Sequence, residues 1–202
     1  MKYLRILFVT LSLMIIMSAC GNRMSADRFQ SIQKKLFELK SYKCIAEIRI
    51  VNNKNTTKYI VKQYYIHPSK FKVEVLEPEF IKGLLTISDG SETKVSNPNI
   101  DVNNTYVSES IIKLTGNNML LTYFFSNYVS SEKSNMEISG DKYRLKTYIT
   151  SETDYMSAEI LGISKEGYPE SLEIFDKEGR LKLQIKYIEF VMNPILDGIT
   201  LN

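Results

Sequence analysis

Hydrophobic and polar residues alternate along two long stretches of this chain. Between residues 42 and 96, and again between 134 and 191, the alternation has the period of a strand with one buried face. Polar turns rich in Asn, Asp, Lys and Gly separate the runs. We therefore expect strands at 42–51, 58–66, 71–76, 83–88, 92–96, 134–139, 142–150, 156–163, 170–176 and 180–191.

Helical spacing occurs near the start of the chain and in its middle. One amphipathic helix is indicated by apolar residues that recur every three or four positions: Phe29, Ile32, Leu36 and Leu39. A short helix is predicted at 108–114, ending before Gly116. Residues 119–129 are apolar on nearly every side, so they form either an ordinary core helix or a helix lodged in the hollow of a curved sheet.

Together these elements predict a fold that is mainly β with a few helices, in the α+β class. We expect a strongly curved antiparallel sheet that forms an incomplete barrel, with the helices in its concave mouth. Residues 27–202 are long enough to bury a core, and we interpret them as a single domain.

The first nineteen residues predict a signal peptide. Lys2 and Arg5 precede a short apolar run that ends in small residues directly before Cys20. Met17-Ser18-Ala19-Cys20 resembles the lipobox of bacterial lipoproteins, which implies lipidation of Cys20 and a lipidated tether over 20–26. An ordinary secretory signal or an N-terminal membrane anchor are the alternatives. The predicted location is the outer face of a bacterial membrane, where the lipid would anchor the exported chain.

Charge and cysteine content narrow the functional classes. The formal net charge is +3, and Lys2 and Arg5 contribute two of these charges, so we expect no nucleic-acid partner. With Cys20 assigned to lipid, Cys44 has no intramolecular disulfide partner. Its position in the alternation predicts a small buried hydrophobic residue on the face of Tyr42, Ala46 and Ile48.

Residues for catalysis or metal binding are sparse. His67 is the only histidine, and Pro68 follows it, which favours a turn residue over a catalytic base. No nucleotide-binding or nucleophile motif occurs, so we predict no catalytic residue, metal site or cofactor, and no enzyme. A pair of carboxylates in a glycan-cleaving site remains an alternative. Solvated outer strand faces are the expected positions of six acidic residues: Glu74, Glu77, Glu137, Glu159, Glu173 and Glu189.

Several short motifs of the chain resemble the lipoprotein-carrier superfamily typified by LolA and LolB. The motifs are His67-Pro68-Ser69-Lys70-Phe71-Lys72, the strand that ends in Asp89-Gly90, Tyr168-Pro169 and Asn193-Pro194. The resemblance implies an incomplete antiparallel barrel with helices in its mouth. The segment Ser91 to Ser96 lacks the aromatic residues that carriers usually have, and the chain contains no Trp.

Within that superfamily, the lipobox and the length of the chain resemble the GerS-type germination lipoproteins of spore-forming bacteria. This resemblance implies a non-catalytic binding partner of a peptidoglycan amidase, an N-acetylmuramoyl-L-alanine amidase, that is required for spore cortex modification and germination. The alternative is a lipid or lipoprotein carrier with an apolar cavity under the 119–129 helix. Exposed strand edges also predict a homodimer formed by strand exchange.

Overall fold

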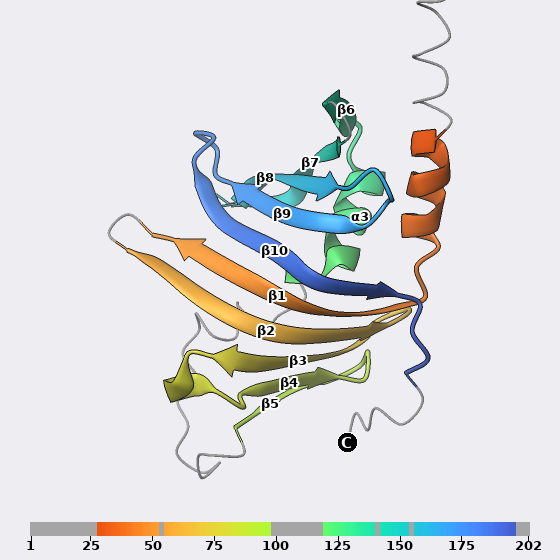
Figure 1. Cartoon of the computed structure of the whole chain (residues 1–202). Helices are drawn as coiled ribbons and strands as arrows, with labels where there is room; N and C mark the ends of the chain where they lie inside the picture. The colour runs from red at the N-terminus through yellow and green to blue at the C-terminus, as the bar shows by residue number, and fades with distance from the viewer. Residues whose placement is uncertain (1–27, 53–54, 98–118, 140–141, 154–155, 197–202) are drawn as a thin grey trace, which may run out of the picture. The chain divides into compact units, whose positions relative to one another are not determined.

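The computed structural model describes residues 28–52, 55–97, 119–139, 142–153 and 156–196 (Figure 1). The chain divides into two compact units, Met1–Glu38 and Leu39–Asn202. In the first unit, residues 28–37 form the helix expected from the spacing of Phe29, Ile32 and Leu36. The helix expected at 108–114 lies outside the described residues. Within those residues, every helix is too short or too polar to cross a membrane.

Ten antiparallel strands form one sheet in the second unit. Each expected strand is present, with its ends shifted by a few residues at most. Their bounds are β1 (Ser41–Val51), β2 (Thr56–Ile66), β3 (Lys70–Glu77), β4 (Leu85–Ser88), β5 (Thr93–Ser96), β6 (Asn135–Ser139), β7 (Lys142–Thr153), β8 (Met156–Ile163), β9 (Pro169–Phe175) and β10 (Leu181–Met192).

The order of the strands is β5-β4-β3-β2-β1-β10-β9-β8-β7-β6. Two meanders, β1 to β5 and β6 to β10, therefore meet where the first strand pairs with the last. The sheet is curved and does not close, because β5 and β6 stand at opposite ends of the order (Figure 1). The predicted fold class, a curved antiparallel sheet forming an incomplete barrel, is confirmed.

One face of the sheet holds the core, and we call it the inner face. Along β1 the buried positions are Tyr42, Cys44, Ala46 and Ile48, as the alternation predicted. The other strands supply their own buried positions in the same way. They include Val61, Val73, Val75, Leu145, Leu161, Ile163, Leu172, Ile174, Leu183 and Ile185.

The apolar segment in the middle of the chain forms α3 (Leu121–Ser130), and a single turn of 3-10 helix, η1 (Glu79–Ile81), follows β3. Phe124 of α3 is fully buried, and its ring lies 5.8 Å from that of Phe125 and 5.9 Å from that of Tyr128. Side chains of β1, β2, β7 and β8 on the inner face bond to α3 or to Met119 just before it. The helix thus lies against the inner face, and the sheet curves around it (Figure 1).

A clasp made by Asn193 holds the end of β10 against the start of β1. The Asn193 Oδ1 accepts hydrogen bonds from the backbone N–H of Lys40 (2.8 Å) and of Ser41 (3.3 Å). The Ser41 hydroxyl donates to the carbonyl of Pro194 (2.9 Å), and the Asn193 N–H donates to the carbonyl of Ser41 (2.8 Å). Asn193 has a φ of 49°, a conformation that asparagine tolerates better than most residues.

Candidate functional site

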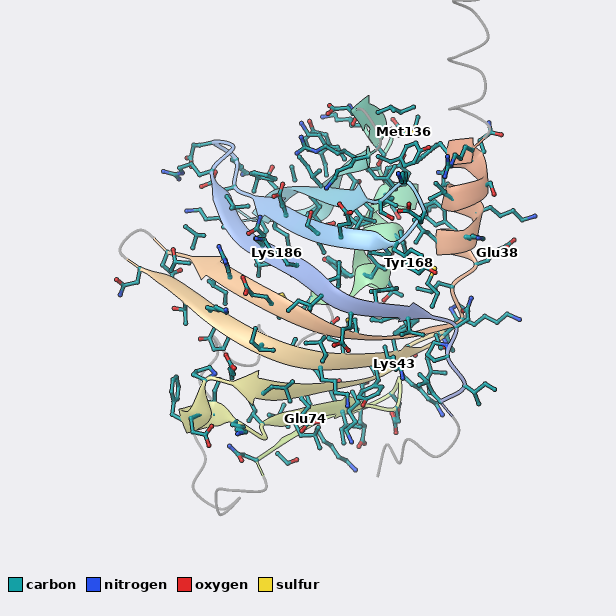
Figure 2. The ribbon with its side chains drawn as sticks, viewed as in Figure 1. Glu38, Lys43, Glu74, Met136, Tyr168 and Lys186 are labelled. Atoms are coloured by element: carbon teal, nitrogen blue, oxygen red, sulfur yellow. The ribbon has the colours of Figure 1, made fainter. Side chains whose placement is uncertain are left out.

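A pocket opens on the outer face of the three central strands, β2, β1 and β10. Its volume is about 270 Å³. Pairing across the strands brings its residues together, because Ile45 lies opposite both Lys62 and Glu189, and Lys43 lies opposite both Tyr64 and Val191. Figure 2 labels Lys43 at this place in the sheet. The lining residues are Lys43, Cys44, Ile45, Lys62, Tyr64, Glu189, Val191 and Leu196.

Charged groups and an aromatic ring lie together in this outer pocket. The Lys62 Nζ lies 5.3 Å from the centroid of the Tyr64 ring, which is within the range of a cation–π contact. Contact with Tyr64 raises the pKa of Lys62, and the carboxylates of Glu74 and Glu189 raise it further. Lys62 therefore keeps its positive charge at neutral pH. A partner would meet cations, a carboxylate, a ring and apolar lining residues.

Exposed apolar residues lie in the second half of β10 and just after it, close in sequence to the pocket residues Glu189 and Leu196. Ile188 is 59% exposed, Val191 is 42% exposed and Ile195 is 87% exposed. Ile195 and the pocket residue Leu196 follow the Asn193 clasp, so the clasp positions the last wall of the pocket. Clustered exposed apolar side chains with a polar rim are typical of protein interaction sites.

On the inner face, polar contacts fix the start of α3. The backbone N–H of Leu121 donates to the hydroxyl of Tyr42 (3.4 Å), and the Gln63 side chain donates to the carbonyl of Met119 (3.4 Å). The Tyr42 ring stacks between two other rings, with centroids 5.4 Å from Tyr65 and 5.2 Å from Phe190. The stacked rings thus hold the Tyr42 hydroxyl in the position where it accepts the hydrogen bond from the start of α3.

A second polar cluster fixes the end of α3. The Asn127 side chain donates to Glu159 Oε2 (3.1 Å), and the Asn127 carbonyl accepts from the Thr147 hydroxyl (3.1 Å). The Ser134 hydroxyl lies 2.9 Å from that of Thr147 and donates to the carbonyl of Tyr128 (2.8 Å). These contacts lie at the last turn of α3, where the Asn127 carbonyl also accepts a hydrogen bond from the backbone N–H of Ser131 (3.0 Å).

Glu159 corrects one expectation from the sequence. We expected it on a solvated outer face, yet its side chain is fully buried on the inner face of β8, in line with Leu161 and Ile163. Burial raises its pKa to about 7, and the hydrogen bond from Asn127 offsets part of that rise. Glu74 and Glu173 are half-buried and Glu77, Glu137 and Glu189 are exposed, as expected for an outer face.

The other residues considered from the sequence occupy plain structural positions. Cys44 is buried and forms no disulfide, its Sγ donates to Gln63 Oε1 (3.6 Å), and burial raises the pKa of its thiol. His67 lies exposed in the turn between β2 and β3, and its backbone N–H donates to the Lys40 carbonyl (2.7 Å). In the described residues, no group of His, Cys, Asp and Glu side chains could hold a metal ion. Cys20 lies outside the described residues.

The described residues thus form a curved antiparallel sheet with α3 on its inner face and a mixed polar and apolar pocket on its outer face. Residues 1–199 match the family described as sporulation protein YdcC-like. The chain belongs to this family of sporulation proteins.

Individual relatives are distant from this chain. The sporulation protein YdcC of Bacillus subtilis (strain 168) is 21% identical over 198 residues, which is 95% of this chain and 57% of that protein. The chain thus spans little more than half the length of this relative. Within this chain, the motifs that resemble the LolA and LolB superfamily run from His67 to Pro194.

Among solved structures, one chain of the complex between the CwlD amidase from Clostridioides difficile and the GerS lipoprotein is 24% identical to this chain. The TM-score is 0.48, with 82% of this chain and 94% of that chain covered. A LolA superfamily protein from Nitrosomonas europaea is 14% identical, with a TM-score of 0.42 and coverage of 83% and 94%. Both groups that the sequence motifs named, the LolA-like and the GerS-type proteins, therefore occur among the similar structures.

Proposed function

We propose that the chain is a lipid-anchored, non-catalytic partner of a peptidoglycan amidase that modifies the spore cortex, and that the outer pocket is part of its contact surface. The observation that carries the proposal is the family match over residues 1–199, because it ties the chain to sporulation. The lipobox-like segment before Cys20 supports export and anchoring at a membrane surface.

The outer pocket supports the assignment of a contact surface. Lys43, Lys62 and Glu189 can give a partner charge-assisted contacts, while Ile45, Val191 and Leu196 add apolar lining. The exposed Ile188 and Ile195 enlarge the apolar area beside it. Strand edges at β5 and β6 are a second possible contact, because an edge strand can pair with another chain, including a second copy of this one.

Reconstitution tests the amidase role directly. A cortex amidase from the same organism would be assayed on purified peptidoglycan, alone and with the full-length chain in detergent micelles. GerS was solved with the CwlD amidase, so an amidase of that type is the enzyme to choose first. We expect activity or stable binding only when both proteins are present. No binding and unchanged activity would refute the proposal.

Charge reversals test the pocket. The paired changes Lys43→Glu and Lys62→Glu should weaken amidase binding at least tenfold, because they replace both cations of the pocket. Lys186→Glu is the matched control, since Lys186 is an exposed lysine on β10 that does not line the pocket (Figure 2). If the control weakened binding as much as the pocket changes do, the contact surface would lie outside the pocket.

The anchor has its own test. Cys20→Ser should prevent lipidation and move the chain from the membrane fraction to the soluble fraction, or leave it unprocessed. Intact mass measurement of the wild-type chain should show cleavage after residue 19 and added acyl chains. Loss of residues 1–19 without added lipid would indicate an ordinary secretory signal.

The same purified protein distinguishes a carrier from a partner protein. Acyl chains that co-purify noncovalently in equimolar amount would favour a lipid or lipoprotein carrier with its cavity under α3. Analytical ultracentrifugation of the same sample would test the predicted homodimer. A monomer at all concentrations would exclude stable strand exchange in solution.

A further inference from the structure

Glu159 is a buried acid that has only one polar partner in the described structure. Its Oε2 accepts a hydrogen bond from Asn127, and its Oε1 has no hydrogen-bond partner within the described residues. Asp176, also buried, differs because its Oδ2 meets Arg180 Nε at 2.8 Å and Lys182 Nζ at 3.3 Å. Cations thus balance the charge of Asp176, whereas an amide alone faces Glu159.

The groups around Glu159 come from four elements. In the sheet, Thr147 of β7 and Ile174 of β9 are its direct cross-strand neighbours. Asn127 approaches from α3. Tyr187 of β10 is the titratable group that interacts with Glu159, its buried hydroxyl has no described hydrogen-bond partner, and burial raises its own pKa. No positive charge therefore reaches the carboxyl group from these four elements.

The position of Glu159 relative to α3 adds a second electrostatic effect. Asn127 belongs to the last turn of α3, and the Thr147 and Ser134 hydroxyls bond to the carbonyls of Asn127 and Tyr128 there. The carbonyl end of a helix carries partial negative charge. A carboxylate at Glu159 would face the large cost of burying a charge and this negative helix end, while a neutral carboxylic acid would face only the smaller cost of burying a polar group.

We propose that Glu159 is a pH-dependent latch for α3, in which the neutral acid holds the last turns of the helix on the inner face and ionisation releases them. The start of the helix stays attached through Tyr42 and Gln63, whose contacts do not involve Glu159. The latch concerns the fold of this chain alone, so it stands or falls independently of the amidase role.

The direction of the effect follows from the two states of the carboxyl group. In the docked state its pKa lies at about 7, compared with 4.5 for the exposed group. Below pH 4.5 the group is neutral in both states and docking is strongest. As the pH rises from 4.5 to 7, the released state gains by ionisation. Above pH 7 both states are ionised, and docking has weakened by roughly 300-fold in total.

Amide hydrogen exchange of the full-length chain in detergent micelles tests the latch. Protection factors for the amides at 125–131, corrected for the intrinsic effect of pH, should fall at least tenfold between pH 5.5 and pH 8.5. The Glu159→Gln variant keeps an acceptor for Asn127 but cannot ionise, so its protection should stay constant over that range. Amides of β1 and β2 serve as the internal reference.

Three outcomes would overturn the latch. One is an unchanged protection factor for 125–131 in the wild-type chain. Another is the same pH profile in the wild-type chain and in Glu159→Gln. The third is a loss of protection in β1 and β2 in step with α3, which would mean general unfolding. If the variant fails to fold, the carboxyl carbon shift of Glu159 in the wild-type protein decides, and a midpoint below pH 5 overturns the proposal.

Discussion

Glu47 on the outer face and Glu159 on the inner face show how one sheet treats the same side chain in opposite ways. Both lie in interior parts of strands. Glu47 contacts Lys58 at 2.9 Å and Arg49 at 2.7 Å, and the contact with Lys58 is the largest cause of its lowered pKa. Glu159 has a single neutral partner, and burial raises its pKa to about 7.

The two faces of the sheet therefore differ in how well they tolerate a change of charge. The outer face can exchange charged partners with solvent or with another protein, because its ion pairs are half-exposed. The inner face offers Glu159 a single neutral partner on α3, so a change of charge there affects the position of the helix. The changes below test the inner face, the junction of the two meanders and the outer face, in order of decreasing expected effect.

Truncation of the core of α3 should have the largest effect on stability. Phe124→Ala removes a fully buried ring and should lower the free energy of unfolding by about 3 to 5 kcal/mol. Val129→Ala, on the same helix but 73% exposed, should change it by less than about 0.5 kcal/mol. Urea denaturation of both variants measures the difference. Equal effects would mean that α3 does not pack as described.

Titration of Glu159 should have the next largest effect. Because its pKa rises from 4.5 unfolded to about 7 folded, its contribution to stability is complete below pH 4.5 and is lost as the pH rises to 7. The wild-type free energy of unfolding should fall by about 3 kcal/mol relative to Glu159→Gln over this range. Parallel urea titrations at several pH values measure the gap. A constant gap would mean that Glu159 has an ordinary pKa in the folded chain.

Loss of the clasp should have a moderate effect. Asn193→Ala removes the acceptor shared by Lys40 and Ser41 and places alanine at a φ of 49°, so stability should fall by about 1 to 3 kcal/mol. Asn193→Asp keeps the acceptor and should recover much of the loss. Thermal unfolding measures both. The alanine variant should also bind the proposed partner more weakly, because Leu196 lines the outer pocket just beyond the clasp.

Neutralisation of Glu47 should have the smallest effect. Glu47→Gln removes the charge that pairs with Arg49 and Lys58, and half-exposed ion pairs of this kind contribute less than about 1 kcal/mol. Denaturation at low and high salt measures the change. A loss as large as that from Phe124→Ala would show that the outer face is as tightly constrained as the inner one.

Periodicity predicted most of the fold because each strand has a polar face and a buried face. Cys44, for example, was assigned correctly from its alternation with Tyr42 and Ala46. The helix predicted at residues 119–129 is observed as α3 at Leu121–Ser130. The order of the strands, with β1 beside β10, depends on pairing between distant residues that local patterns do not specify.

Glu159 was misplaced because both faces of β8 are apolar. Ala158 and Ile160 alternate with Leu161 and Ile163, so the charged residue was assigned to solvent by its chemistry rather than by its position. The spacing to Leu161 and Ile163 was the signal that could have placed it inward. The outer pocket was not predicted at all, since Lys43, Lys62 and Glu189 come together only through strand pairing.

The central position of β1 and β10 has a consequence for how the chain acquires its structure. The two strands that join the meanders are the first and the last of the described strands in sequence, and Lys40 and Asn193, which bond across this junction, are 153 positions apart. During synthesis or export, β1 therefore lacks a partner strand on one side until β10 is available to pair with it. Contacts over such separations slow folding, and an unpaired strand invites aggregation. A chain truncated before β10 would thus contain β1 to β5 and β6 to β9 with no strand to join the two parts of the sheet.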